Sequence, residues 1–351
     1  MGHYNRVSIA LATYNGEKFL VNQLNSISNQ YRQPDEIIIC DDCSTDRTID
    51  ILTDFARRST FDVVIFRNDT NLGYEANFFK AMSYCTGDVI ALCDQDDVWH
   101  PKKLERCVQE LENDPRLLFV AHNFEVVNSR LEKITHKYAS LALSRINPPA
   151  SIPPLTLFLG QSIVATAKLV NIVRTAYGAK SYNEIVPSNF IVGHDTYLSV
   201  VGASIGYSKY IGTKLSFYRR HETNTVFKMG DLDLGTETKH FTNYYANAYD
   251  NYAKLLQCWI NILEFLQSIF IEESEIRAAI LKSQLRYRHL KEAYNNRAVL
   301  YDSFNSHPTQ LFYLLKNVFN GDYSKRKNAG LGYKSLVKDA YNICNCSPPK
   351  Q

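Results

Sequence analysis

Short apolar runs alternate with helical patterns along roughly the first 110 residues of the chain. The predicted strands are Arg6–Ala12, Glu36–Cys40, Val63–Phe66 and Val89–Cys93. Between them, apolar residues recur three and four positions apart, as they do on amphipathic helices. This alternation predicts an α/β fold with a Rossmann-like, mostly parallel, doubly wound sheet.

The strand Val89–Cys93 ends in an acidic turn that contains Asp94, Asp96 and Asp97. Carboxylates crowded at one strand end repel one another unless a cation lies among them. That edge of an α/β sheet is also where ligands bind. We therefore interpret the turn as the site of a divalent metal, Mg²⁺ or Mn²⁺, that holds a diphosphate. A solvated acidic turn is the simpler alternative, because a lone D-x-D pattern is common by chance.

Polar residues also follow the first two predicted strands. Thr13 and Tyr14 come after the first strand, and Asp41 and Asp42 end the second. In a parallel sheet these turns share one edge, where a nucleotide would lie. The first turn lacks the glycine-rich fingerprints of dinucleotide and P-loop sites, so side chains and metal must hold a nucleotide here.

The middle of the chain predicts further strands and two more polar sites. The strand candidates are Leu117–His122, Phe124–Val127, Phe158–Ala165, Tyr207–Ile211 and Leu215–Tyr218. Asp195 precedes a helical pattern, where a carboxylate is either functional or an ordinary helix start. The last strand ends in Arg219, Arg220 and His221. These side chains could face a phosphate or a metal, or they could form a solvated basic turn.

Long helical patterns begin near Lys239 and define a second region. A seam from Tyr245 to Phe270 predicts a helical hairpin packed on the first region, and a dimer seam is the second interpretation. A later apolar stretch has basic residues nearby: Lys316, Lys325, Arg326, Lys327, Lys334 and Lys338. Both a membrane-surface anchor and a core-facing helix fit that tail. We place the domains at 1–235 and 236–351.

The composition of the chain limits the classes of protein to which it can belong. The net charge of +3, from 39 basic and 36 acidic residues, is too close to balance to indicate nucleic-acid binding. Hydrophobic residues make up 45% of the chain, which is enough for a sizeable core. No signal peptide or membrane span is expected. The eight cysteines form no regular framework, which favours a reducing, cytoplasmic compartment.

Six segments together resemble the family 2 glycosyltransferases, which are inverting enzymes of GT-A fold. They are VSIALATYNGEKFL, IIICDDCSTDRT, NLGYEANF, TGDVIALCDQDDVWHPKKL, GHDTYL and FYRRHETN, in that order. The CDQDDVW and HD…YRRH forms are most similar to the bacterial branch that includes rhamnosyltransferases of surface polysaccharides such as O-antigen. The resemblance runs from Val7 to Asn224 and does not cover the C-terminal α-helical extension.

The resemblance implies roles for individual residues. Tyr14 would lie against the nucleotide base, Asp42 would accept a hydrogen bond from a pyrimidine N–H, and Asp195 would be the catalytic base. The implied nucleotide-binding set is Thr13, Tyr14, Asp41, Asp42, Asn77 and Asp94. The implied metal ligands are Asp96, Asp94 and His221. The residues implied for the substrate or acceptor are Trp99, Asp97, His194, Arg219 and Arg220.

The function implied is a metal-dependent transfer of a sugar from a nucleoside-diphosphate sugar, either dTDP-L-rhamnose or a UDP-hexose. The acceptor would be a hydroxyl of a growing cell-surface glycan or a lipid-linked oligosaccharide. The implied location is the cytoplasm, with peripheral contact at the inner face of the membrane as an option. A non-catalytic sugar-nucleotide-binding or assembly subunit is the alternative, and a phosphoacceptor signalling domain is a weaker rival.

Overall fold

The computed structural model describes residues 4–134, 144–152, 158–178, 192–222, 241–301, 307–320, 336 and 339–340. Contacts between residues divide the chain into two compact units. The first comprises Met1–Ala179 and Ile191–Leu232, and the second holds the helices from Phe241 onward.

Within the described residues, the strands of the first unit form one sheet. They are β1 (Val7–Thr13), β2 (Glu36–Asp41), β3 (Asp62–Arg67), β4 (Val89–Cys93), β5 (Val98–Trp99), β6 (Leu117–Val127), β7 (Arg145–Asn147), β8 (Ile163–Thr166) and β9 (Tyr207–Arg219). Their order is β3-β2-β1-β4-β8-β6-β9-β5, and β7 pairs with β9. The first four strands in this order are parallel, whereas β8 is antiparallel to both of its neighbours. The predicted α/β sheet is confirmed, and beyond β4 it is mixed.

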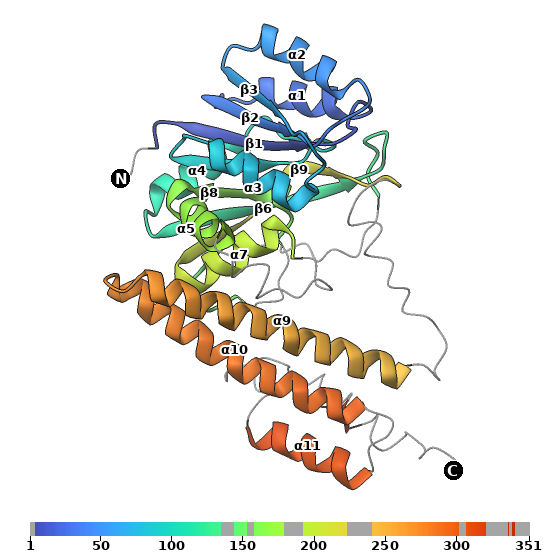
Figure 1. Cartoon of the computed structure of the whole chain (residues 1–351), viewed down its shortest axis with the longest axis vertical. Helices are drawn as coiled ribbons and strands as arrows, with labels where there is room; N and C mark the ends of the chain where they lie inside the picture. Colours follow the sequence, from blue (N-terminus) through green and yellow to red (C-terminus); the bar gives the residue numbers. More distant parts are fainter. Residues whose placement is uncertain are drawn as a thin grey trace. The chain divides into compact units, whose positions relative to one another are not determined.

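Helices cover both faces of the sheet (Figure 1). They are α1 (Leu20–Ser28), α2 (Thr48–Arg58), α3 (Tyr74–Tyr84), α4 (Lys103–Asn113), α5 (Ala167–Gly178) and α7 (His194–Ile205), with a short 3-10 turn, η1 (Gly160–Ser162), before β8. One core cluster joins α1, α2 and α4 to alternate residues of β1, such as Val7, Ile9 and Leu11. Helices α3, α5 and α7 contact one another and pack on the opposite face. Strands β1, β2 and β4 are therefore buried along their whole length, as their continuous apolar runs predict.

Several predicted strand boundaries are wrong because strands bend without ending. The two candidates at Leu117–His122 and Phe124–Val127 form the single strand β6, whose register shifts at Asn123. The two candidates after residue 206 likewise form the single strand β9. The sequence did not predict β5, which lies just beyond the acidic turn and pairs Trp99 with Ser216 of β9.

Two helix details also differ from the sequence prediction. The spacing of Leu20, Leu24, Ile27 and Tyr31 predicts a helix that includes Tyr31, but α1 ends at Ser28 and the Tyr31 side chain is 66% exposed. Ser44 is of a residue type that commonly caps helices and predicts a cap for the second helix, but α2 begins at Thr48 without a side-chain cap. The Ser44 hydroxyl donates a hydrogen bond to Asp41 instead, because the turn after β2 folds back on the strand end.

The second unit contains α9 (Phe241–Ile269), α10 (Ser274–Tyr301) and α11 (His307–Phe319). Helices α9 and α10 lie side by side as a hairpin (Figure 1), and the chain reverses at the break predicted near Glu272. The seam residues Leu256, Trp259, Leu263 and Leu266 are buried, whereas Tyr252 of the same predicted seam is exposed. The sequence pattern thus located the hairpin, with Tyr252 as an exception in the seam.

Buried polar pairs join the later helices of this unit. Asn296 of α10 donates a hydrogen bond to the side-chain oxygen of Asn317 on α11 at 2.9 Å. The guanidinium of Arg297 and the hydroxyl of Tyr301 both lie 2.8 Å from the carboxylate of Asp339. Burying a charge requires such a partner, so these contacts fix the register of α10 against its neighbours.

None of the helices in the described ranges is long and apolar enough to cross a membrane. The predicted domain boundary at residue 235, Asn224 at the end of the resemblance, and the basic tail residues 325–327, 334 and 338 lie outside the described residues.

Candidate active site

The carboxyl ends of β2, β1 and β4 bring the predicted polar turns together. These strands are neighbours and parallel, and Thr13 at the end of β1 is paired in register with Asp41 at the end of β2. The acidic turn, from Asp94 to Asp97, follows β4 on the other side of β1. One rim of the sheet therefore carries these candidate residues, as predicted for an α/β ligand site.

Asp41 is fully buried and organises the turn that follows β2. Its carboxylate accepts hydrogen bonds from the Thr13 hydroxyl at 3.0 Å and from the Ser44 backbone N–H at 2.9 Å. Tyr14, by contrast, is 49% exposed, and only its backbone is fixed, by two hydrogen bonds to the side chain of Gln95. The rim thus presents an exposed aromatic ring next to a turn that is held by hydrogen bonds.

Asp42 and Asn77 are also buried, and both are hydrogen-bonded to protein groups. The Asp42 carboxylate accepts hydrogen bonds from the backbone N–H groups of Leu72 and Gly73, at 2.7 and 2.9 Å, and from the side chain of Asn68 at 2.7 Å. Asn77 donates to the Cys40 carbonyl at 2.7 Å. Asp42 therefore holds the turn between β3 and α3, in which Gly73 has a φ of 83° that favours glycine.

Asp97 and Arg219 support the acidic turn from inside the protein. Asp97 is fully buried and accepts a hydrogen bond from the Arg219 backbone N–H at 2.8 Å. The Arg219 guanidinium is buried too, and it donates to the carbonyls of Asp96 and Ser129, each at 2.7 Å. Burial, together with the carboxylates of Asp96 and Asp94, raises the pKa of Asp97 well above its ordinary value. The end of β9 therefore fixes the shape of the turn.

Asp96 and His221 form the closest pair of predicted metal ligands. His221 Nε2 lies 2.8 Å from Asp96 Oδ2. The His221 side chain is 10% exposed and the Asp96 side chain is 17% exposed. The imidazole also packs against the ring of Phe19, with centroids 4.6 Å apart. The structure thus brings together two residues that are 125 positions apart in sequence.

Asp195 lies in the first turn of α7, and η1 fixes it. Its Oδ2 accepts a hydrogen bond from the Gly160 backbone N–H at 3.1 Å. Burial, then the carboxylates of Asp96 and Asp195, raise the pKa of Asp94 to about 8. The candidate base therefore lies within electrostatic reach of the acidic turn, although the two segments are distant in sequence.

His194 is buried beside Asp195. Its ring stacks on Phe78 with centroids 3.6 Å apart, and neither ring nitrogen has a hydrogen-bond partner among the described residues. Burial lowers the pKa of His194 to about 4, so the ring is neutral near pH 7. Arg220, the remaining predicted substrate residue, is half-buried, and its backbone N–H donates to the Val127 carbonyl at 2.8 Å.

Sequence reasoning missed Tyr74, at the start of α3. Burial and, to a smaller extent, the carboxylate of Asp195 raise the pKa of Tyr74 to about 12. This phenol therefore lies within electrostatic reach of the candidate catalytic base. The ring of Tyr74 also meets His194 edge-on, with centroids 6.4 Å apart. A tyrosine directly after the turn glycine Gly73 was the available signal, but nothing in the pattern distinguished it from a core aromatic residue.

Lys103 is a second residue that the sequence did not reveal. It is fully buried on α4, donates to the Gln161 carbonyl at 2.6 Å and lies 3.3 Å from the centroid of the Trp99 ring. Burial lowers the pKa of Lys103 to about 7. Its neighbour Lys102 carries the same charge, so only the packing of α4 shows which lysine lies beneath the acidic turn. Trp99 is 2% exposed and forms part of this support.

A metal site is only partly formed by protein side chains. No group of three or more His, Cys, Asp or Glu residues in the described ranges is placed to hold an ion. The Asp96 carboxylate and the His221 imidazole nevertheless form a mixed oxygen and nitrogen pair at the rim. Mg²⁺ is commonly held by one or two protein carboxylates, with substrate phosphates and waters as its other ligands. The pair therefore fits a metal that depends on the substrate for its remaining ligands.

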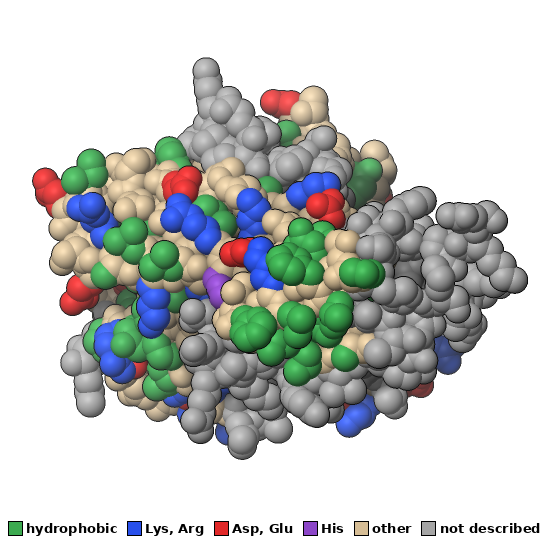
Figure 2. Space-filling view, turned by 90° about the horizontal axis from the view of Figure 1, so that it is seen from below, with side chains coloured by type: hydrophobic (Ala, Val, Ile, Leu, Met, Phe, Trp, Pro, Cys, Tyr) green, Lys and Arg blue, Asp and Glu red, His purple; other side chains and the backbone are tan. Residues whose placement is uncertain are grey.

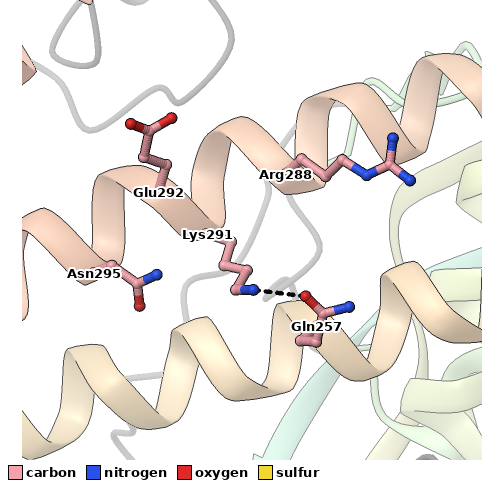
Figure 3. Close-up of a pocket in the computed structure, with 5 residues that line it drawn as sticks. All are labelled: Gln257, Arg288, Lys291, Glu292 and Asn295. Carbon is pink, nitrogen blue, oxygen red and sulfur yellow. Dashed lines mark hydrogen bonds between the residues drawn. The ribbon is translucent and has the colours of Figure 1, made fainter.

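A cavity of about 320 Å³ lies in the second unit, between α9 and α10. Gln257, Arg288, Lys291, Glu292 and Asn295 line it, and Lys291 is hydrogen-bonded to Gln257 at 2.6 Å (Figure 3). Both basic side chains of the lining have protein partners, because Lys291 bonds to Gln257 and Arg288 pairs with Glu264 at 2.7 Å. None of the predicted site residues lines this cavity, so we assign the candidate site to the sheet rim on its chemistry.

Comparison with known families finds a match in the first unit. Residues 8–161 match the family described as Glycosyl transferase family 2. The match covers somewhat less than half of the chain. The matched region includes the acidic turn and the first two polar turns. Asp195 and His221 lie beyond it, in the same compact unit.

Relatives of this chain include two proteins of Bacillus subtilis (strain 168). EpsE, named as a glycosyltransferase, is 36% identical over 107 residues, which are 30% of this chain and 38% of EpsE. The chain thus spans well under two thirds of the length of EpsE. TuaG, named as a teichuronic acid biosynthesis glycosyltransferase, is 26% identical over 186 residues, which are 52% of this chain and 73% of TuaG.

A solved structure supports the fold. The crystal structure of S. aureus TarS 1-349 in complex with UDP has a TM-score of 0.51 to this chain at 14% identity, and covers 96% of this chain and 90% of that chain. The chain therefore has a GT-A type fold, with a mixed central sheet, helices on both faces and an additional C-terminal helical region.

Proposed function

We propose that the chain is a metal-dependent, inverting glycosyltransferase that moves a sugar from a nucleoside-diphosphate sugar to a hydroxyl group. The observation that carries this proposal is the placement of three carboxylates at one rim of the sheet, in the unit that contains the family 2 match. Asp96 is paired with His221 at 2.8 Å, and Asp195 lies close enough to affect the ionisation of Asp94. Such a rim can bind a diphosphate on one side and remove a proton on the other.

The donor would lie along the ends of β1, β2 and β4. The exposed ring of Tyr14 offers a stacking surface for the nucleotide base. Beside it, the hydrogen bond between Thr13 and Asp41 fixes the turn. Asp42 and Asn77 act here mainly by shaping this end of the sheet, since both are already hydrogen-bonded to protein groups. Both dTDP-L-rhamnose and UDP-hexoses fit this proposal, and the UDP bound to TarS supports a pyrimidine nucleotide.

Asp96 and His221 would hold the divalent ion, Mg²⁺ or Mn²⁺, with Asp94 beside them. A bound metal acts as a Lewis acid that stabilises the charge of the departing diphosphate. Asp94 contributes by holding a proton up to near-neutral pH, because its pKa is raised to about 8. That proton limits the repulsion among the three carboxylates when no cation is present.

Asp195 would take the proton of the attacking hydroxyl. It lies in the first turn of α7, and the Gly160 N–H fixes one of its oxygens. A single base is sufficient for an in-line displacement with inversion, whereas retention requires a second carboxylate as nucleophile. Asp97, Trp99 and Arg219 then act on the substrate through the shape of the turn, and His194 and Arg220 lie on the acceptor side.

The proposed acceptor is a growing cell-surface glycan or a lipid-linked oligosaccharide. The name of TuaG, which refers to teichuronic acid biosynthesis, supports the surface-glycan part of this assignment. We further propose that the protein works in the cytoplasm, at the inner face of the cell membrane, where such acceptors are extended.

The test compares two carboxylates that each lie in the first turn of a helix. Asp195→Asn should leave the stabilisation by donor and Mn²⁺ in a thermal-shift assay unchanged, and should abolish most release of nucleoside diphosphate in the presence of acceptor. Asp50→Asn, in the exposed first turn of α2, should change neither quantity. If both variants behave alike, or if Asp195→Asn loses donor stabilisation, Asp195 is an ordinary helix start and the proposal fails.

A further inference from the structure

Helix α11 is amphipathic in the reverse of the usual sense. Its buried positions include the polar residues Gln310 and Asn317, which are 6% and 0% exposed, beside Leu314. Its outward positions are all apolar, and they are 42% to 85% exposed: Leu311, Phe312, Leu315, Val318 and Phe319. A helix that only had to pack on its neighbours would place these residues inward, so the outward face needs another explanation.

The exposed residues form one continuous face. They stand at positions i, i+1, i+4, i+7 and i+8, which share about one third of a helical circumference. The inward side is fixed, because Asn317 is bonded to Asn296 and Lys316 pairs with Glu292 of α10 at 3.2 Å. Rotation of α11 would break these contacts. Seen from below, hydrophobic side chains gather in one patch over α11, with Lys and Arg side chains beside it (Figure 2).

The charge of the sequence next to α11 indicates what kind of surface could cover its apolar face. Residues 316–338 hold six of the basic residues of the chain and a single acidic one, Asp322. This stretch therefore carries a net +5, whereas the rest of the chain carries −2 against the overall +3. Helix α11 itself contains no Asp or Glu. A second copy of the chain would bring two such basic stretches together, whereas an anionic lipid surface would attract them.

We propose that the apolar face of α11 is the surface by which this protein binds anionic membranes. The helix would lie in the plane of the interface, with Phe312 and Phe319 among the acyl chains. This mode of binding needs no membrane-spanning helix. It extends the proposed function to a defined contact surface, and it concerns a unit that contains none of the candidate catalytic residues.

The test is flotation of the full-length chain with lipid vesicles. The chain should float with vesicles that contain phosphatidylglycerol, and less so with pure phosphatidylcholine or at high salt. Phe312→Ser and Phe319→Ser should each weaken binding by about 10-fold, since membrane affinity follows the apolar area buried. The matched control is Leu285→Ser on α10, where a leucine outside the face of α11 is 66% exposed, and it should bind as the wild type does.

Three outcomes would overturn the proposal. The first is a wild-type chain that does not float with anionic vesicles, and the second is a control variant that loses as much binding as the two phenylalanine variants. The third is a wild-type dimer in sedimentation velocity that both phenylalanine variants dissociate, which assigns the face to a second copy. Circular dichroism and thermal unfolding confirm that the variants are folded. Because vesicle binding requires neither donor nor metal, its failure is separate from failure of the proposed transfer activity.

Discussion

Gly16 and Gln95 allow a direct test of how the first polar turn is joined to the acidic turn. Gln95 Oε1 accepts the Tyr14 N–H at 2.9 Å, and its Nε2 donates to the Tyr14 carbonyl at 3.0 Å. A Cβ atom on Gly16 would lie 2.3 Å from that Oε1 and 2.8 Å from Gln95 Cδ. Gly16→Ala should therefore displace the Gln95 side chain and break both hydrogen bonds.

The size of the effect follows from two opposing contributions. Two hydrogen bonds at a partly exposed site stabilise the fold by about 1–2 kcal/mol together. Alanine offsets about 0.4–1 kcal/mol of this loss, because it reduces the conformational entropy of the unfolded chain. Gly16 does not have a positive φ, so alanine fits its backbone. We expect Gly16→Ala to lower the free energy of unfolding by about 1 kcal/mol in the wild-type background.

In a Gln95→Ala background the obstruction is gone, and the same substitution should raise the free energy of unfolding by about 0.4–1 kcal/mol. Urea denaturation of the four proteins in this double-mutant cycle measures the change of sign. Gly178→Ala is the control, since a Cβ there meets nothing within 4 Å, and it should have the same effect in both backgrounds. An equal loss from Gly16→Ala in both backgrounds would refute the reasoning, because the constraint would then lie in the backbone.

Two further predictions concern the carboxylates of the rim. The pKa of Asp94 is raised in the fold to about 8, so the stability that its protonated form contributes is complete below about pH 4 and is lost as the pH rises through about 8; Asp94→Asn should flatten this fall in a series of denaturation curves. Asp42→Asn should lower the free energy of unfolding by about 2 kcal/mol, because an amide cannot satisfy all three donors that meet this carboxylate. The exposed Asp69→Asn should leave the unfolding curve unchanged, and an equal effect of the two substitutions would contradict the second prediction.

The central strands were predictable because burial on both faces leaves a clear trace in the sequence. The predicted limits of Val89–Cys93 are those of β4, and those of the first three strands differ from the structure by a single residue at one or both ends. Polar residues at the ends of such runs could then be assigned to one edge, since parallel neighbours align their carboxyl ends. This local rule was sufficient to place Thr13, Asp41 and the acidic turn on the same rim.

The rest of the site depends on contacts that leave no local pattern. Lys102 and Lys103 are neighbouring lysines that the sequence pattern does not distinguish, yet only Lys103 is buried beneath the turn. Arg219 read equally well as a phosphate ligand or as a solvated cation, and the structure shows its guanidinium buried against backbone carbonyls. Both outcomes follow from long-range packing, of α4 in one case and of β9 in the other.

Strand β9 explains how a cluster of like charges persists in the folded protein. Its last residue, Arg219, donates to the side chain of Asp97 through the backbone and to the carbonyl of Asp96 through the guanidinium. Two residues later, His221 meets the Asp96 carboxylate from the open side. Repulsion within the turn would otherwise separate these carboxylates. Because β9 opposes that repulsion from the interior, the carboxylates of the turn stay together at the rim of the sheet.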